Sequence, residues 1–369
     1  MFKVKIFGAG SVGNHLAHAS RRLGWDVTVC DLDPKALTRM KEEIYPTRYG
    51  LWDPAITLRT NTETSVGGFD LICIGTPPDH HLSLALQSLR EGPRAILVEK
   101  PLCTPSLDRA QDFYLAVRDS STRVFVGYDH VVGKATKHAE ALIRSGVIGQ
   151  VQTIDVEFRE HWGGIFKAHP WLSGPEDSYL GYWERGGGAS GEHSHAINLW
   201  QHFAHVAGAG RVVEVSAMLN YVKAGSAIYD DLCLMSLRTE KGLIGRVVQD
   251  VITCPPRKRA RVQGSEGAVE WVNGYNPDGD AVLCLMPGRD DEVHLIPKKR
   301  PDDFIEELTH LQAQIEHPGE PSGISLDRGL DTMLVVAAAH CAERSQCRLQ
   351  IDYSRGYGLH ALQPLKPQE

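Results

Sequence analysis

Residues 2–13 read Phe-Lys-Val-Lys-Ile-Phe-Gly-Ala-Gly-Ser-Val-Gly, and this stretch decides the fold of the first half of the chain. The apolar residues before Gly8 predict a strand, and the apolar positions from 12 to 23 recur at helical spacing. Gly8, Gly10 and Gly13 stand between the strand and the helix, where a pyrophosphate must approach the backbone closely at a helix N-terminus. The stretch therefore predicts a dinucleotide-binding turn.

A second predicted strand, residues 27–30, ends at Asp31. A dinucleotide fold places a carboxylate near this point, on the ribose hydroxyls. Asp31 favours NAD over NADP as the cofactor, because a carboxylate repels a 2′-phosphate. A glycine pattern alone is a weak signal, but the order strand, glycines, helix, strand and acid is a stronger one. The alternatives are FAD, a methyl-donor cofactor, or a turn that merely needs small residues.

The composition is that of an ordinary soluble globular protein, with 369 residues, 42% hydrophobic and 23% charged. A net charge of −7 argues against a nucleic-acid or acidic-membrane partner, because counterion release requires a basic surface. The N-terminus has no signal-peptide pattern, and no apolar run approaches the ~20 residues that span a bilayer. The eight cysteines form no Cys-x-x-Cys pair, which predicts reduced thiols in a cytoplasmic protein.

Two further apolar runs, residues 71–74 and 95–98, predict strands that are covered on both faces. The carboxyl ends of parallel strands face the ligand crevice, so residues just beyond them are placed to touch the cofactor. Thr76, Pro77 and His81 follow the first run. For His81, a local hydrogen bond at a helix start is an equally good interpretation.

The second run ends in Glu99-Lys100-Pro101. A lysine at a strand exit is most often a surface charge, but this exit lies on the crevice side, and a Lys-Pro bond permits a cis turn. A lysine held beside a nicotinamide ring and a substrate hydroxyl can donate or accept a hydrogen bond there.

Three motifs carry a family resemblance: Gly-Ala-Gly-Ser-Val-Gly at 8–13, Thr76-Pro77 with His81 and Ala85 following, and Val-Glu-Lys-Pro-Leu at 98–102. Together they resemble the Gfo/Idh/MocA oxidoreductases, the glucose-fructose oxidoreductase and inositol dehydrogenase group. In that family the lysine contacts substrate and nicotinamide, so the resemblance makes Lys100 a catalytic candidate. The cofactor-binding candidates are Gly8, Gly10, Ser11, Val12, Gly13, Asp31, Thr76, Pro77, His81 and Glu99.

From residue 151 onward the pattern changes to alternating strands with few helices, which predicts an open, mainly antiparallel sheet. We therefore expect an α/β protein with a Rossmann dinucleotide-binding domain at 1–127 and an α+β domain at 128–369. A helix at 326–343 either belongs to the second domain alone or also packs back on the first. In the family such a sheet often carries a second subunit on one face, which implies a homodimer or homotetramer.

Residues 186–200 read Gly-Gly-Gly-Ala-Ser-Gly-Glu-His-Ser-His-Ala-Ile-Asn-Leu-Trp and are predicted to turn into a helix. Glu192 and His195 lie three apart, hence on one helical face. A carboxylate beside an imidazole orients it and supports its protonated form, which suits a general acid or base. The family usually has an aspartate, a histidine and a second acid here, with the histidine as acid/base. The resemblance extends that role to His195, although the spacing is one residue shorter and Asn198 replaces the last acid.

Two other interpretations of this cluster remain open. A metal held by Glu192, His193 and His195 is disfavoured, because a helix puts the two histidines on nearly opposite faces, and we expect no metal. Alternatively, His195 is a hydrogen-bonded core histidine without a chemical role.

An aromatic-rich connection precedes the three glycines. It contains His161, Trp162, Phe166, His169, Trp171, Tyr179, Tyr182 and Trp183. Aromatic rings stack on sugar C–H faces, so the segment is either a substrate lid or a small core of its own. The substrate-contact candidates are Arg159, Trp162, Tyr182 and Arg185.

The sequence thus predicts an NAD-dependent oxidoreductase acting on a hydroxyl or keto carbon of a sugar, a nucleotide sugar or a polyol. Lys100 would hold the reacting oxygen, and His195, oriented by Glu192, would relay its proton. An NAD-retaining glycoside hydrolase of the same fold and a non-enzymatic NAD(H) sensor are the alternatives.

Overall fold

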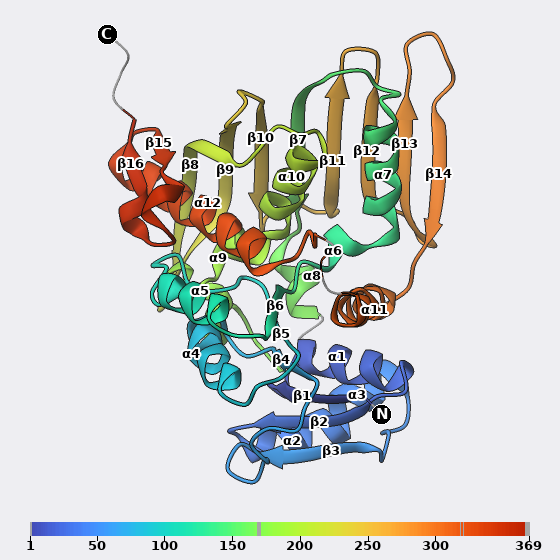
Figure 1. Cartoon of the computed structure of the whole chain (residues 1–369), viewed down its shortest axis with the longest axis vertical. Coiled ribbons are helices and arrows are strands. Elements are labelled where there is room, and N and C mark those ends of the chain that lie inside the picture. Colours follow the sequence, from blue (N-terminus) through green and yellow to red (C-terminus); the bar gives the residue numbers. More distant parts are fainter. Residues whose placement is uncertain (1, 168–170, 318, 320, 366–369) are drawn as a thin grey trace.

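Two β-sheets organise the computed structural model, which describes residues 2–167, 171–317, 319 and 321–365. A six-stranded sheet and a ten-stranded sheet lie one after the other along the longest axis of the molecule (Figure 1). The predicted succession of a Rossmann domain and a domain with a mainly antiparallel sheet is confirmed. The boundary between residues 127 and 128 stays a prediction.

The first sheet is parallel throughout and has the strand order β3-β2-β1-β4-β5-β6. Its strands are β1 (Lys3–Phe7), β2 (Asp26–Asp31), β3 (Ile56–Thr60), β4 (Leu71–Ile74), β5 (Ala95–Val98) and β6 (Arg123–Val126). The connecting helices are α1 (Ser11–Arg22), α2 (Pro34–Arg39), α3 (Tyr45–Tyr49), α4 (Pro78–Leu89) and α5 (Ala110–Arg118). β4 and β5 are buried at every position, as strands covered on both faces should be.

The second sheet has the order β14-β13-β12-β11-β7-β10-β9-β8-β15-β16. Its strands are β7 (Val151–Arg159), β8 (Val212–Ala224), β9 (Ala227–Thr239), β10 (Ile244–Asp250), β11 (Arg257–Gly264), β12 (Ala268–Asn276), β13 (Gly279–Leu285), β14 (Glu292–Pro297), β15 (Leu349–Ile351) and β16 (Leu362–Pro364). β7 and β10 pair in parallel, whereas the other pairs given between strands of this sheet are antiparallel.

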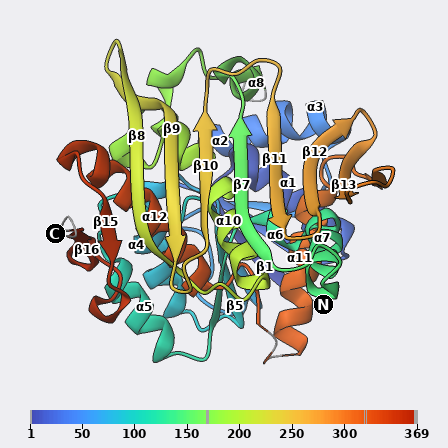
Figure 2. The ribbon, with the colours of Figure 1, turned by 90° about the horizontal axis from the view of Figure 1, so that it is seen from above.

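Helices cover one face of the second sheet, and Figure 2 looks onto the other face, which is bare in the described part of the chain. The covering helices are α7 (Lys134–Ser145), α10 (His195–Val206) and α12 (Leu326–Ser345). Side chains alternate along the strands. In β9, for example, Cys233, Met235 and Leu237 are buried, whereas Leu234 points to the bare face. Met218 lies opposite Leu234 in the register and is 72% exposed.

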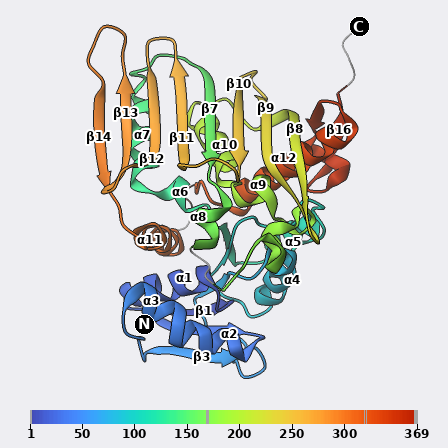
Figure 3. The same cartoon turned by 180° about the vertical axis from the view of Figure 1, so that it is seen from behind.

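Two helices of the second half also contact the first domain (Figure 3). α11 (Asp302–Glu316) lies against α1, where Phe304 stacks on His15 with ring centroids 4.9 Å apart. Before α12, Ile324 accepts a hydrogen bond from the backbone N–H of Val126 at 2.8 Å. Glycine at 329 lets α12 approach β6, because a Cβ there would lie 2.3 Å from Val126 Cγ2. The C-terminal helix therefore packs back on the first domain.

α3 continues the helical segment that starts with α2, through one π-helical turn (Met40–Ile44). Tyr45 and Tyr49 pack there against His18 of α1, where the Tyr49 and His18 rings stack 3.7 Å apart. Among the described residues, no helix is both long and apolar enough to cross a membrane.

Candidate active site

The glycine turn joins β1 to α1 in the geometry that the sequence predicts. Gly8 has a φ of +102°, and a Cβ there would lie 2.7 Å from the carbonyl oxygen of Gly75. A Cβ at Gly13 would lie 1.9 Å from the carbonyl oxygen of Gly8, so a side chain is excluded at both positions. Gly10 precedes the first turn of α1, and an added Cβ there would meet nothing within 4 Å. The helix therefore begins beside open space.

This helix start suits a bound anion. α1 has no side-chain hydrogen bond at its N-cap and no acidic residue in its first turn. Its first backbone N–H groups and the positive end of the helix dipole favour a negative group. Ser11 and Val12, the first two helical residues, stand at this end, and Val12 packs against Gly75, where an added Cβ would lie 3.6 Å from Val12 Cγ1. These residues fit the pyrophosphate of a dinucleotide.

Asp31 is the last residue of β2, as predicted, and its carboxylate is tied to the glycine turn. One oxygen accepts the Ala9 N–H at 2.8 Å, and the other accepts the Asp33 N–H at 2.9 Å. A 2′-phosphate at the ribose position would meet this carboxylate, which keeps the preference for NAD.

His81 does not line the cofactor path, which corrects the predicted cofactor contact. Its side chain is 0% exposed, and its ring nitrogens lie 2.6 Å from the Thr76 carbonyl oxygen and 3.0 Å from the Pro101 carbonyl oxygen. Burial lowers the pKa of His81 to about 4. The imidazole thus ties together the two loops that follow β4 and β5, and this corresponds to the local hydrogen bond weighed as the alternative. Thr76 and Pro77 do stand at the carboxyl end of β4.

Lys100 follows β5 and reaches across to the second half of the chain. Its ammonium donates to the Glu192 carbonyl oxygen at 2.9 Å and to Glu192 Oε2 at 3.0 Å, and its side chain is 15% exposed. The Lys100–Pro101 peptide bond is cis. The structure therefore brings Lys100 and Glu192 together.

Glu99 lies behind this pair rather than beside it. Its carboxylate packs on Gly127, where a Cβ would lie 2.8 Å from Glu99 Oε2. Burial, reinforced by the nearby charge of Asp129, raises the pKa of Glu99 to about 8. Glu99 as a whole is only 6% exposed. Its burial does not favour the predicted cofactor contact.

Glu192 and His195 do not share one helix, which corrects the predicted geometry. α9 (Gly188–Glu192) ends at Glu192, and α10 starts at His195, with His193 and Ser194 in the break between them. The carboxylate that faces His195 is Asp129, with Oδ1 3.6 Å from Nδ1. Glu192 therefore pairs with Lys100, and Asp129 occupies the position beside the imidazole that was predicted for Glu192.

Burial lowers the pKa of His195 well below its usual value, and Asp129 opposes this effect by stabilising the imidazolium. The imidazole is thus neutral at neutral pH and able to accept a proton. A neighbouring carboxylate supports the charged form that it then takes.

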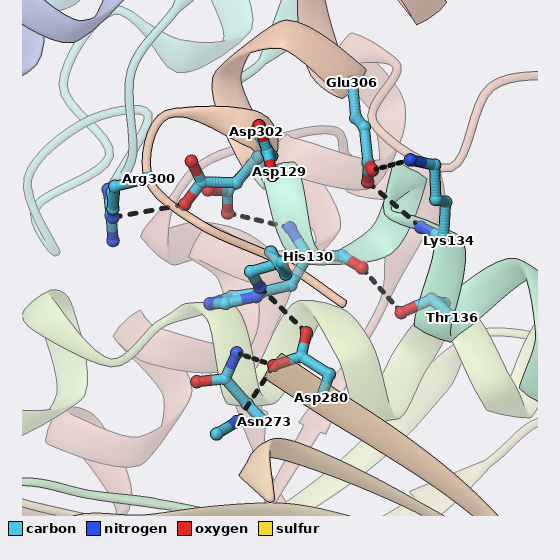
Figure 4. A network of polar contacts seen from close by, with 12 residues as sticks. Asp129, His130, Lys134, Thr136, Asn273, Asp280, Arg300, Asp302 and Glu306 are labelled. Carbon is cyan, nitrogen blue, oxygen red and sulfur yellow. Dashed lines mark hydrogen bonds and ion pairs between the residues drawn. The ribbon is translucent and has the colours of Figure 1, made fainter. Parts of the chain in front are cut away.

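A second imidazole, His130, completes this cluster and was missed at the sequence level. The His130 and His195 rings have centroids 4.8 Å apart and lie 73° from parallel. Figure 4 shows Asp129 and His130, both from the short helix α6 (Asp129–Val132), between Arg300 on one side and Asp280 on the other. The Asp129 carboxylate accepts the His130 backbone N–H at 2.7 Å. No motif or spacing in the sequence analysis pointed to His130.

The metal-type donors that converge are Asp129, His130 and His195, whose ligand atoms lie within 4.8 Å of one another. This set differs from Glu192, His193 and His195, the three residues that the sequence analysis considered as metal ligands and disfavoured. Burial lowers the pKa of His130 well below its usual value, and the cations Lys298, Lys258, Arg300 and Lys100 act in the same direction.

The predicted substrate contacts separate into two groups. Trp162 is buried in a small core with Ile165, Leu180 and Tyr229, so the aromatic connection packs at least partly on itself. The Tyr182 hydroxyl lies 2.8 Å from Ser226 Oγ and belongs to the edge of that core. His169 lies outside the described residues.

The two arginines are placed differently. Arg185 binds Asp79, at the start of α4, with Nε 2.8 Å from Oδ2, and it joins the connection to the crevice edge. Arg159 ends β7 and binds Asp250, with Nε 2.5 Å from Oδ2. Of the four candidates, Arg185 is therefore the one that borders the crevice residues.

Comparisons with known proteins agree with the two-domain fold described above. Residues 2–128 match a family model described as an oxidoreductase family with an NAD-binding Rossmann fold. Residues 136–270 match the GFO/IDH/MocA C-terminal domain. No curated protein matches the chain.

Solved structures with the same fold cover nearly the whole chain. An oxidoreductase from Agrobacterium radiobacter, in complex with NAD+, L-tartaric acid and magnesium, is 19% identical, with a TM-score of 0.73 over 95% of this chain and 98% of that one. The WlbA dehydrogenase from Bordetella pertussis, in complex with NADH and UDP-GlcNAcA, is 18% identical, with a TM-score of 0.70 over 99% of both chains. Levoglucosan dehydrogenase, in complex with NADH and levoglucosan, is 17% identical, with a TM-score of 0.74 over 95% and 98%. At these identities the likeness shows a common fold.

Proposed function

The chain belongs to the Gfo/Idh/MocA family and is an NAD-dependent oxidoreductase, and we propose that its substrate is a sugar, a nucleotide sugar or a polyol. The reaction moves a hydride between the cofactor and a carbon that carries a hydroxyl or a keto oxygen. Two of the relatives above were solved with sugar-type ligands, UDP-GlcNAcA and levoglucosan. The observation that carries the proposal is that residues just after β5 and β6, Lys100 and Asp129, pair with Glu192 and His195 on the two sides of the break between α9 and α10.

Lys100 would hold the reacting oxygen. An ammonium has three N–H donors, and two of them meet Glu192, which leaves one for the substrate. A hydrogen bond from a charged donor to an oxygen that develops negative charge strengthens along the reaction. Glu192 fixes the direction of this donor.

His195 would exchange the proton of the same oxygen. In the oxidation direction the neutral imidazole accepts the hydroxyl proton as the C–H hydride leaves and the carbonyl double bond forms. Asp129 then stabilises the imidazolium. In reduction the protonated His195 returns the proton to the oxygen. When bound, NAD supplies the hydride chemistry at C4 of its nicotinamide ring.

An activity screen tests this proposal. The purified protein, NAD and a panel of sugars, polyols and nucleotide sugars should produce NADH with at least one substrate, while Lys100→Ala should not. A wild-type protein that binds NADH but turns over no member of the three classes would contradict the substrate class, and equal activity of Lys100→Ala would contradict the catalytic role.

We also propose that the bare face of the second sheet pairs with another copy, giving a homodimer or homotetramer. Met218, Leu234 and Ile244 place exposed apolar side chains on that face at 72%, 38% and 46% exposure. Light scattering after size exclusion should give a dimer or tetramer mass, and Leu234→Lys should reduce it. A wild-type monomer at micromolar concentration would contradict this.

A cytoplasmic location is part of the same proposal. Its support is that the eight cysteines are all free thiols, which persist in reducing compartments. Fractionation of the source cells tests it directly.

A further inference from the structure

Arg48, a residue of α3, lies at the anion-binding end of α1. Its Nη2 donates to Ser11 Oγ at 2.8 Å, and its Nη1 donates to the Ser11 carbonyl oxygen at 2.9 Å. Ser11 is the first residue of α1, directly after Gly10 of the glycine turn. α3 therefore delivers a guanidinium to the first turn of the helix whose N-terminus fits a pyrophosphate.

Arg48 adds a formal positive charge beside the positive end of the α1 helix dipole. The N-terminus of a helix carries partial positive charge, and it repels a neighbouring guanidinium. Burial lowers the pKa of Arg48, and Arg300 acts in the same direction, although Tyr49 opposes them. A doubly charged pyrophosphate between the guanidinium and the helix N–H groups would reverse this balance.

Arg300 brings a second guanidinium to the same region from the other half of the chain. It lies 5.4 Å above the Phe304 ring, and Phe304 stacks on His15 of α1. Its Nε is 3.3 Å from Asp303 Oδ2, and its side chain is 61% exposed. The Arg300 charge acts on the pKa of Arg48 and, more weakly than other groups, on that of Glu99.

We propose that Arg48 binds the pyrophosphate of the dinucleotide together with the glycine turn, and that Arg300 adds a weaker contact from the second domain. This inference rests on the proposed function, because it takes the bound cofactor as its ligand. It makes a residue outside the glycine motif part of the cofactor site. Through Arg300, the second domain would also contact the cofactor phosphates.

Binding measurements on the full chain test the role of Arg48. NADH and ADP-ribose both carry the pyrophosphate, and fluorescence titration and calorimetry follow them without any turnover. Arg48→Ala should weaken both ligands by about tenfold or more, as expected for the loss of a charge-assisted hydrogen bond. Arg48→Lys should recover part of the affinity, and Arg300→Ala should weaken binding by only about two- to threefold because its side chain is exposed. Arg59→Ala, an exposed arginine on β3, is the matched control and should bind as the wild type does.

A salt series separates phosphate binding from a structural tether between α3 and α1. Added salt should weaken NADH binding to the wild type more than to Arg48→Ala, because the variant has lost a charge pair with the ligand. Equal salt dependence, or NADH affinity within twofold of the wild type, would overturn the inference. A fall in the unfolding temperature of the ligand-free variant together with unchanged salt dependence would assign Arg48 a structural role and overturn it too. If the wild type binds neither ligand, the proposed function itself fails, which is a separate result.

Discussion

Two pairs of side chains make up the candidate active site, and they differ in charge state and in spacing. They are Lys100–Glu192 and His195–Asp129. Lys100 Nζ and Glu192 Oε2 form an ion pair at 3.0 Å. His195 and Asp129 lie 3.6 Å apart, and burial keeps the imidazole neutral. The difference indicates a division of labour, because a fixed cation holds an oxygen whereas a neutral imidazole can take its proton. Each carboxylate supports one of these states.

The largest expected effect is on the cationic pair. Lys100→Ala removes the donor to the reacting oxygen, so kcat should fall by about 10²- to 10⁴-fold while the NADH affinity changes little. Steady-state kinetics and fluorescence titration measure the two quantities. Lys134→Ala is a matched control, because Lys134 also pairs with a glutamate, Glu306, at 3.1 Å but is 70% exposed. A near-normal kcat for Lys100→Ala would show that Lys100 does not hold the reacting oxygen.

The second prediction separates the two carboxylates through the pH dependence of oxidation. Activity should be lost as the pH falls through the pKa of His195, since the protonated imidazole cannot accept the substrate proton. Asp129 raises that pKa, so Asp129→Asn should move the acid limb to lower pH and reduce kcat by about tenfold. Glu192→Gln should reduce kcat without moving the limb. A limb that moves in Glu192→Gln and stays in Asp129→Asn would restore the partner that the sequence suggested.

His195 faces Asp129 rather than the predicted Glu192, and this difference shows which features local sequence patterns can predict. The glycine turn, Asp31, and the lysine at the end of β5 follow from local patterns, because each is fixed by residues within one strand, turn and helix. The break at His193 and Ser194 between α9 and α10 puts Glu192 and His195 on different helices, and the two residues pair with Lys100 and Asp129. The sequence spacing of three residues carried no sign of it.

The contacts that were missed join residues far apart in the chain. Asp129 meets His195 across 66 positions, and Arg48 meets Ser11 across 37. No periodicity within a window predicts such pairs. Trp162 shows the opposite problem, because its residue type suits a lid and a core equally well, and only its neighbours decided for a core.

The third prediction concerns Glu99, the buried acid behind both pairs. Its pKa of about 8 lies above the ordinary value of 4.5, so the folded state binds a proton that the unfolded state releases. Stability should therefore fall as the pH rises from about 4.5 to 8, and Glu99→Gln should lose less stability over that range, a difference of a few kcal/mol at most. Thermal unfolding at pH 5 and pH 8 measures it. An equal drop in Tm for both proteins would show that Glu99 is an ordinary acid.

The smallest effect is expected at a third pair that crosses the crevice, Arg185–Asp79. It is the most exposed of the three, with 42% of the Arg185 side chain accessible, so solvent screens it. Arg185→Ala should raise KM by about two- to fivefold and leave kcat nearly unchanged if the arginine contacts substrate. An unchanged KM would make the pair a surface contact, and a large fall in kcat would place Arg185 with the catalytic pairs.

The most direct test of the account is a fluorescence titration of the purified protein with NADH and with NADPH. The glycine turn and Asp31 predict tight binding of NADH and weak binding of NADPH. Equal or tighter binding of NADPH would contradict the role of Asp31. If neither dinucleotide binds and mass spectrometry finds no retained cofactor, the dinucleotide site is wrong and the catalytic assignments fall with it.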